Sequence, residues 1–213
     1  MLAVRHGQTI NSSQLGRDFG ATTKTINDYL DILEGSFLWV RLPPYRANIG
    51  KRLTSSPKGY LADTGLLHHL LDITSLGHLE THPILGPSWE GWVIEQVRRQ
   101  VALMEPPARL YYWRTQAGAE VDLVLELGGR LLPIEIKHSA EIGAMEIRGL
   151  KQFLRDFSAQ ATTGFVIYRG KELRRMESNI WLVPVEIACL QEQVPGARKA
   201  RTAALKKRRT QTS

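Results

Sequence analysis

The chain has 213 residues, of which 43% are hydrophobic and 23% are charged, so we expect one ordinary domain and a smaller companion. It has no apolar stretch of about 18 residues and no charged-then-apolar leader, which predicts a cytoplasmic protein that does not enter a membrane. The single cysteine, Cys189, excludes an intramolecular disulfide and a cysteine-based zinc cluster.

The net charge of +7 is concentrated near the C-terminus. Seven of the 28 basic residues lie between positions 198 and 209, and the rest of the chain holds 21 basic and 21 acidic residues. Residues 195–213 have almost no large apolar side chains, so we expect a disordered basic tail with weak, salt-sensitive affinity for phosphate. Residues 1–60 hold eight basic and four acidic residues, which makes this part the better surface for a nucleic acid.

The first elements in chain order are two short helices, a strand and a hairpin. The pattern predicts a short helix that Ser12 or Ser13 caps and that runs through Phe19, with Gly20 ending it. A second helix is predicted to begin at a cap by Thr22 or Thr23 and to end at Gly35. An apolar strand follows at residues 37–42 and a polar, hairpin-like segment at 45–58. The second helix carries an apolar stripe at Ile26, Tyr29, Leu30 and Leu33.

This order is typical of a small winged helix-turn-helix, which we assign to residues 1–60. The hairpin would be the wing and the second helix the recognition helix. That helix also exposes Asp28, Asp31 and Glu34, whose charges repel phosphate, so this part of the chain could bind DNA or dock a protein. The residues expected to contact nucleic acid are Lys24, Arg46, Lys51, Arg52 and Lys58, with Arg114 further along the chain.

Residues 61–87 are expected to connect the two parts of the chain. A short helix is predicted over residues 63–71, followed by a polar, proline-containing segment. His78 and His82 are four residues apart, as in a helical metal pair, but Pro83 follows at once and no acid-rich motif frames them. We therefore interpret them as connector histidines.

Residues 88–194 change to a long helix followed by strands, which predicts a mixed α/β domain with a mixed sheet (α+β). Gly128 and Gly129 form a hairpin turn between the second and third strands. The predicted strands are 110–113, 120–127, 131–137, 164–168 and 180–185, with a helix at 144–157 between the third and the fourth.

The predicted hairpin carries two carboxylates and an ammonium group. Alternate side chains of a strand share a face, so Glu135 and Lys137 point the same way, and the hairpin can bring Asp122 beside them. The same alternation places Val121 and Leu123 on the opposite face from Asp122. An ordinary polar face of an antiparallel sheet would give a similar pattern.

The helix before the hairpin favours a functional site over an ordinary polar face. At about 100° per residue, Glu90 falls inside the apolar arc of this helix, whereas Glu95 points away from it. A carboxylate facing a core is unfavourable unless it is paired or bound to a cation. The apolar members of the arc are Trp89, Trp92, Val93, Val97, Val101 and Met104.

Three acids and a lysine that converge in a partly buried place suit a hard divalent cation. We expect Mg²⁺ or Mn²⁺ to be held by Asp122, Glu135 and the backbone carbonyl of Ile136, with Glu90 bound directly or through water. Such an ion acidifies a water molecule and neutralises charge on a phosphate. Lys137 would orient or help deprotonate that water, or stabilise the transition state. The expected catalytic residues are thus Glu90, Asp122, Glu135 and Lys137.

Four short motifs resemble the signature of the PD-(D/E)XK nuclease superfamily. In that superfamily a helix glutamate, a strand aspartate and a strand Glu-x-Lys pair follow one another, and Glu90, Asp122, Glu135 and Lys137 fill these positions. The resemblance implies a restriction-endonuclease-like core preceded by the small winged helix-turn-helix. The motifs are WEGWV at 89–93, YWRT at 112–115, GAEVD at 118–122 and PIEIK at 133–137.

Residues 15–190 resemble more closely the C-terminal half of prokaryotic AAA-type ATPases that carry a nuclease-like domain of unknown function. The ATPase domain of that family is missing here, and no G-x-x-x-x-G-K-[ST] loop is present, so we expect no ATP hydrolysis by this chain itself. An ATPase domain or another protein would be a partner supplied in trans. The junction motifs are YL at 29–30, LPPY at 42–45, GKRL at 50–53, SPK at 56–58 and DTGL at 63–66.

Two functions remain open at this point. The first is a metal-dependent nuclease that hydrolyses DNA phosphodiesters, either as an endonuclease or by processing DNA ends. The second is a catalytically silent, nuclease-like module that binds DNA or a protein and regulates an ATPase.

Overall fold

The computed structural model describes residues 2–45 and 56–189. Within these ranges the protein is a mixed α/β structure with seven α-helices, a three-stranded antiparallel sheet and a six-stranded mixed sheet. None of the helices in this part is long and apolar enough to cross a membrane.

The N-terminal lobe (residues 2–84) contains two helices packed on the small sheet, whose strand order is β1-β3-β2. Its elements are a 3-10 turn (Ala3–Arg5), β1 (Gln8–Thr9), α1 (Ser12–Phe19), α2 (Thr23–Gly35), β2 (Trp39–Leu42), β3 (Lys58–Leu61), α3 (Thr64–Leu70) and α4 (Leu76–Thr81).

The remaining described residues form the large sheet and three helices. The strand order is β4-β5-β6-β7-β9-β8, parallel for β6-β7-β9 and antiparallel elsewhere. The elements are α5 (Leu85–Val101), β4 (Arg109–Arg114), β5 (Glu120–Leu127), β6 (Arg130–Ile136), α6 (Arg148–Asp156), β7 (Gly164–Tyr168), β8 (Arg174–Glu177), β9 (Ile180–Pro184) and α7 (Val185–Cys189).

The two predicted N-terminal helices are confirmed, and local hydrogen bonds explain their ends. Asn11 caps α1 by accepting a bond from the backbone N–H of Gln14 at 3.1 Å, one position before the predicted serine caps. Gly20 ends α1 with a φ of 66°, a conformation that favours glycine. Thr22 caps α2 through the N–H of Thr25 at 3.1 Å.

Several short elements were not predicted from the sequence. The 3-10 turn and β1 lie where we expected no element, and α4 lies inside the predicted connector. Strand β2 begins at Trp39 rather than at Phe37, because Phe37 has a φ of 60° and is exposed. The rings of His78 and His82 lie 5.8 Å apart at the end of α4 and belong to no metal-binding group among the described residues.

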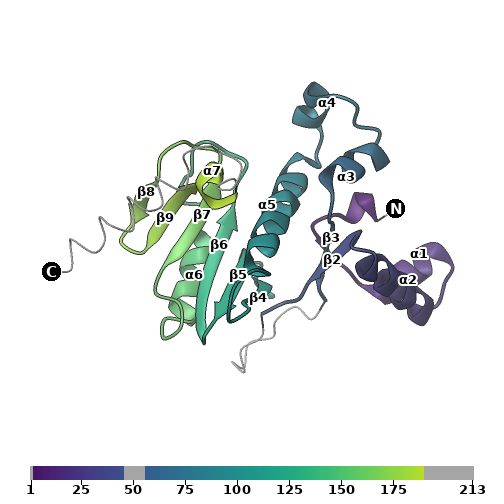
Figure 1. Ribbon diagram of the computed structural model, residues 1–213, viewed down its shortest axis with the longest axis horizontal. Coiled ribbons are helices and arrows are strands. Elements are labelled where there is room, and N and C mark those ends of the chain that lie inside the picture. The colour runs from purple at the N-terminus through teal and green to yellow at the C-terminus, as the bar shows by residue number, and fades with distance from the viewer. Residues whose placement is uncertain (1, 46–55, 190–213) are drawn as a thin grey trace.

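Helix α5 lies between the two sheets (Figure 1). Leu42 and Tyr60 from the small sheet share one hydrophobic core with Val93 and Ile94 of α5 and with Leu123 of the large sheet. This position corrects the prediction for Glu95, which is buried rather than turned to solvent. A helix packed between two sheets buries more than one stripe, and Glu95 is compensated there by ion pairs with two arginines, Arg98 and Arg99.

Helices cover both faces of the large sheet. Helix α6 packs on one face through Leu150, Phe153 and Leu154, which keep the helical spacing expected from the sequence. Helices α5 and α7 lie on the other face. The turn at Gly128 and Gly129 is confirmed by positive φ values of 57° and 77°.

A β-bulge interrupts the pairing of β4 with β5. Tyr111 pairs with Val124 and Trp113 pairs with Val121, so Asp122 and the residue after it both face Tyr112. The extra residue breaks the alternation of side chains. Val121 and Val124 therefore pack in the same core on the α6 face.

The bulge corrects the face assignment made from the sequence. Leu123 packs on the α5 face, opposite to Val121, although strict alternation predicted that both would share a face. Asp122 occupies the bulge itself. The first predicted acid of the hairpin thus stands where the strand bends and its backbone pairing is interrupted.

Candidate functional site

Strands β5 and β6 bring three of the predicted site residues together. The ammonium nitrogen of Lys137 lies 2.7 Å from Oε1 of Glu135 and 3.8 Å from Oδ2 of Asp122. Oδ2 of Asp122 also accepts a hydrogen bond from the backbone N–H of Ile136 at 2.8 Å. Both carboxylates are buried and Lys137 is partly exposed. The group is therefore accessible mainly from the side of Lys137.

Helix α5 adds Glu90 to this group. Oε1 of Glu90 accepts hydrogen bonds from the Tyr60 hydroxyl at 2.6 Å and from Nζ of Lys58 at 3.0 Å. Its side chain is 18% exposed, which agrees with the inward orientation predicted from the helical arc. The next residue of α5, Gly91, lets the N-terminal lobe approach the helix closely at this point, because a Cβ atom at Gly91 would overlap the ring of His6.

Negative charge exceeds positive charge around the carboxylates. Burial, and then the charge of Asp122, raise the pKa of Glu90 to about 7 against the opposing effect of Lys58. The same two causes raise the pKa of Glu135 well above its usual value, although Lys137 opposes them. Burial would lower the pKa of Lys137, but the charges of Asp122 and Glu135 outweigh it and raise that pKa. The four predicted residues thus act on one another electrostatically, and an added cation would relieve the repulsion.

The carboxylates offer a place for one divalent ion rather than a complete cage. Oε2 of Glu135 is buried and has no hydrogen-bond partner. No three acidic, histidine or cysteine side chains in residues 2–45 and 56–189 are grouped closely enough to form a metal site by themselves. Mg²⁺ usually takes only one or two carboxylates from a protein and fills its other positions with water or substrate oxygens. Asp122 and Glu135 could supply those carboxylates, with the carbonyl of Ile136 remaining the predicted backbone ligand, while Glu90 is engaged by its own partners.

Lys58 corrects the prediction of an exposed wing residue. Its side chain is only 5% exposed, and its ammonium group forms ion pairs with Glu90 and Glu120. Burial would lower the pKa of Lys58, but the charges of Glu90, Asp122 and Glu120 outweigh burial and raise it. Lys58 therefore belongs to the carboxylate group and is not available to a phosphate on the surface.

The other predicted nucleic-acid contacts are distributed differently. Lys24 is exposed on α2 and pairs with Asp28 at 3.1 Å. Arg114 is at the rim of the carboxylate group, where its Nε lies 3.4 Å from Oε2 of Glu120. The predicted contacts Arg46, Lys51 and Arg52 lie outside the described residues.

Two members of the group, Glu120 and Tyr60, were not assigned to the site from the sequence. Glu120 could have been assigned to the site from the sequence, because strand alternation places it on the same face as Asp122. No sequence pattern indicated Tyr60, because it lies 30 residues before Glu90 on a strand of the other sheet. Only the packing of the N-terminal lobe on α5 brings Tyr60 to the carboxylates.

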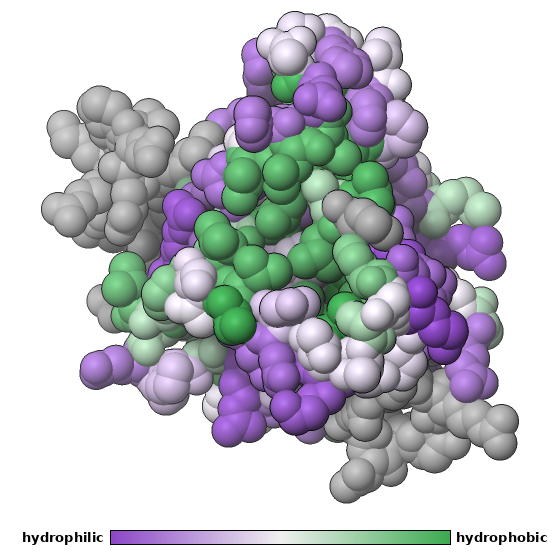
Figure 2. Space-filling model, turned by 90° about the vertical axis from the view of Figure 1, so that its right-hand side faces the viewer, coloured by the Kyte–Doolittle hydropathy of each residue, from purple (hydrophilic) through white to green (hydrophobic). Residues whose placement is uncertain are grey.

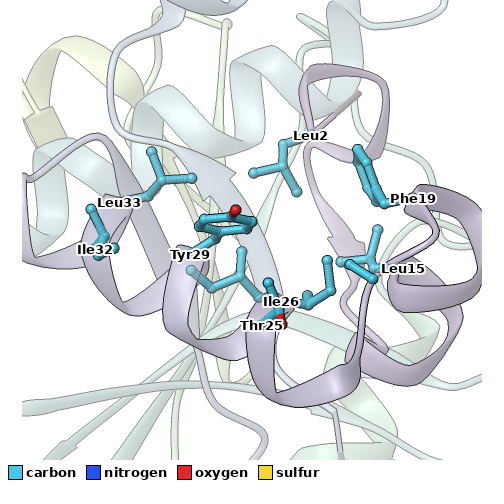
Figure 3. A pocket seen from close by; sticks show the side chains of 10 residues that line it. Leu2, Leu15, Phe19, Thr25, Ile26, Tyr29, Ile32 and Leu33 are labelled. Atoms are coloured by element: carbon cyan, nitrogen blue, oxygen red, sulfur yellow. The ribbon is translucent and has the colours of Figure 1, made fainter.

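A second surface feature is an apolar groove of about 660 Å³ over α1 and α2. Figure 2 shows a broad apolar area on this face of the molecule. Leu2, Phe19, Tyr29 and Leu33 point into the same space (Figure 3). Tyr29 is 59% exposed, so the apolar stripe predicted on α2 is only partly covered by the protein's own core, and Ile32 next to the stripe is 62% exposed.

Comparison with known proteins divides the chain close to α5. Residues 1–77 match the model of a family described as Domain of unknown function (DUF8612), and residues 85–188 match Domain of unknown function (DUF4143). The chain combines these two domains. Lys58 belongs to the DUF8612 domain and Glu90 to the DUF4143 domain, so the ion pair between them joins the two.

The chain is homologous to two mycobacterial proteins over most of its length. It is 40% identical over 186 residues to Uncharacterized protein Rv2008c of Mycobacterium tuberculosis and to Uncharacterized protein Mb2031c of Mycobacterium bovis. The match covers 87% of this chain and 40% of each relative, so the chain spans less than half the length of these relatives. No solved structure matches the chain.

Proposed function

We propose that the chain is a metal-dependent nuclease that hydrolyses phosphodiester bonds in DNA. The carboxylate group carries this proposal, because Asp122, Glu135 and Lys137 converge on adjoining strands and Glu90 joins them from a helix. The unpartnered, buried oxygen of Glu135 adds the chemical reason, since it is a ligand atom that lacks a partner. In this proposal the DUF4143 domain is a restriction-endonuclease-like core of the PD-(D/E)XK type and the N-terminal lobe is a winged helix-turn-helix.

The residues of the carboxylate group would have separate roles in hydrolysis. Asp122, Glu135 and the Ile136 carbonyl would hold Mg²⁺ or Mn²⁺, with Glu90 acting through water. When bound, the ion would supply Lewis acidity at the scissile phosphate and its attacking water. Lys137 is the partly exposed member of the group, so its ammonium group would orient the water and neutralise charge that develops on the phosphate.

DNA would reach the carboxylate group from the side of Lys137. Arg114 is half exposed at the rim and could neutralise a flanking phosphate. Lys24 is the described residue of the N-terminal lobe that we assign to a more distant phosphate. The proposed DNA path thus joins the exposed basic groups to the buried acids.

The decisive experiment is cleavage of plasmid and linear DNA with Mg²⁺ or Mn²⁺, repeated with a chelator. We predict that cutting requires the metal and that Lys137→Ala lowers the rate by at least about 100-fold, because it removes the ammonium group beside the reacting water. Lys151→Ala is the matched control, since Lys151 forms an ion pair with Glu177 elsewhere. Circular dichroism should show that both variants remain folded.

A folded wild-type protein that cuts neither DNA form in any divalent metal would contradict the nuclease proposal. Equal loss of activity in Lys137→Ala and Lys151→Ala would contradict the role of Lys137. Retardation of DNA without cleavage would support the second function instead, a silent binding module.

The apolar groove favours a protein partner for the N-terminal lobe in that second function. Two acids of α2, Asp31 and Glu34, pair with Arg41, the first of them at 2.6 Å, while Asp28 pairs with Lys24. The groove lined by Tyr29 and Ile32 is apolar and suits a protein, such as an ATPase supplied in trans, better than a phosphate backbone. A Tyr29→Ser/Ile32→Ser variant should then bind DNA as the wild type does. Weaker DNA retardation by this variant would show that α2 contacts DNA.

A further inference from the structure

Lys58 is a buried cation that the proposed hydrolysis does not use. Strand β3 carries it from the small sheet into the space between α5 and β5. Its ammonium group contacts Glu90 at 3.0 Å, pairs with Glu120, and lies 5.6 Å from the centre of the Tyr112 ring. A lysine with this many partners is held in one position, because leaving it would bring two partly buried acids together without a cation between them.

The charged groups fall into two pairs of acids, each with one lysine. Lys58 contacts Glu90 and Glu120, whereas Lys137 contacts Glu135 and lies near Asp122. When these six side chains are ionised, four negative charges face two positive ones, and Arg114 adds a third positive charge at the rim beside Glu120. One divalent cation would therefore leave the group close to neutral, and a second one would give it a clear excess of positive charge.

We propose that Lys58 is a built-in substitute for a second metal ion, so that the site accepts a single divalent cation. The ammonium group occupies the place between Glu90 and Glu120 where a second ion would bind. The place of the first ion, at Asp122 and Glu135, rests on the proposed function. Lys58 is then a positioning residue supplied by the N-terminal lobe, and the site is incomplete without that lobe.

Binding of Mn²⁺ to the whole chain tests this proposal without measuring cleavage. Isothermal titration, with electron paramagnetic resonance to count free Mn²⁺, gives both stoichiometry and affinity. We expect one ion in the wild type. Lys58→Met should take a second ion or bind at least about tenfold more tightly, because it removes a positive charge a few ångströms from the acids. Lys58→Arg keeps the charge and should behave as the wild type, and so should the control Lys151→Met.

A second variant allows the same test if the Lys58→Met protein does not fold. Lys58→Met/Glu120→Gln removes the cation together with one of its acids, so the local net charge is unchanged. Glu90 is still released from its lysine in this variant, and we again expect tighter Mn²⁺ binding than in the wild type. Thermal unfolding monitored by circular dichroism establishes which variants are folded.

Each result separates this proposal from the nuclease proposal. Two ions in the wild type, or unchanged binding in a folded Lys58→Met or Lys58→Met/Glu120→Gln variant, would overturn the role of Lys58 and leave the nuclease proposal standing. Binding only in the variants would overturn the single-ion site of the wild type and also contradict a metal-dependent wild-type enzyme. Absence of Mn²⁺ binding in the wild type and in the folded variants would overturn both.

Discussion

At the scale of single residues, His6 shows how burial decides the state of a titratable group. Its Nδ1 accepts a hydrogen bond from the N–H of Leu61 at 3.0 Å, so its Nε2 carries the proton and donates to the carbonyl of Pro87 at 3.1 Å. The ring also packs edge-on against Tyr60. Burial lowers the pKa of His6 from 6.5 to about 4, although the bond to Pro87 opposes this shift. The N-terminal segment is thus tied to α5 by a neutral histidine.

The lowered pKa of His6 predicts loss of stability in acid. The unfolded chain binds a proton at this histidine near pH 6.5, whereas the folded protein does so only near pH 4. The contribution of neutral His6 to the free energy of unfolding is therefore complete above about pH 6.5 and is lost as the pH falls to about 4. Its magnitude is about 3 kcal/mol. Urea unfolding from pH 7 to 4 should show a shallower decline for His6→Gln than for the wild type. Parallel curves would show that His6 does not titrate in this way.

At the scale of secondary-structure elements, α6 approaches β5 more closely than most side chains would allow. A Cβ atom at Gly149 would overlap the carbonyl oxygen of Glu120, which is backbone and cannot turn aside. Glu120 is the first residue of β5, two positions before the bulged Asp122. The missing side chain at Gly149 therefore lets α6 support the strand that carries the first acid of the site.

We predict that Gly149→Ala destabilises the protein, although alanine is the better helix former. The overlap with the backbone should cost about 1–3 kcal/mol, which exceeds the gain in helix propensity of about 1 kcal/mol. Gly77→Ala in α4 is the matched control, because a Cβ atom there meets no other atom and should be neutral or stabilising. Chemical unfolding measures both variants. A Gly149→Ala protein as stable as Gly77→Ala would show that α6 can move away without cost.

At the scale of the whole molecule, α5 and the core around it join the two domains. Leu42 and Tyr60 from the DUF8612 domain are buried with Val93 and Ile94 from α5, and the Lys58 ion pair crosses the same boundary. Backbone hydrogen bonds of Tyr112 with the chain after β2 add a further link, since its N–H donates to the carbonyl of Pro43 at 3.0 Å. The domains therefore share interior contacts rather than only a linker.

The shared core predicts that the two domains unfold together. Leu42→Ala should lower the free energy of unfolding by about 2–5 kcal/mol, because Leu42 is buried where the two domains meet. Differential scanning calorimetry should show one transition in the wild type and one, at lower temperature, in the variant. Two transitions, of which only the first responds to Leu42→Ala, would show that the domains are independent.

Much of the local structure and part of the site follow from the sequence alone. Helical spacing, the cap at Thr22 and the two glycines of the hairpin turn depend on interactions within a few residues, so they can be recognised without the fold. The neighbouring strands place Asp122 near Glu135 and Lys137 for the same reason. Glu90 could be added because one helical turn is enough to show that it shares a face with apolar residues.

The remaining features of the site depend on packing between distant parts of the chain. Lys58 has the sequence context of a surface lysine, yet it is buried because β3, α5 and β5 meet around it from distant parts of the chain. The bulge at Asp122 and the burial of Glu95 have the same origin in packing between elements. Local periodicity indicates which side of an element is apolar, but it does not indicate which other elements pack against that side. The environment of each charge in the site therefore depends on contacts that only the folded chain creates.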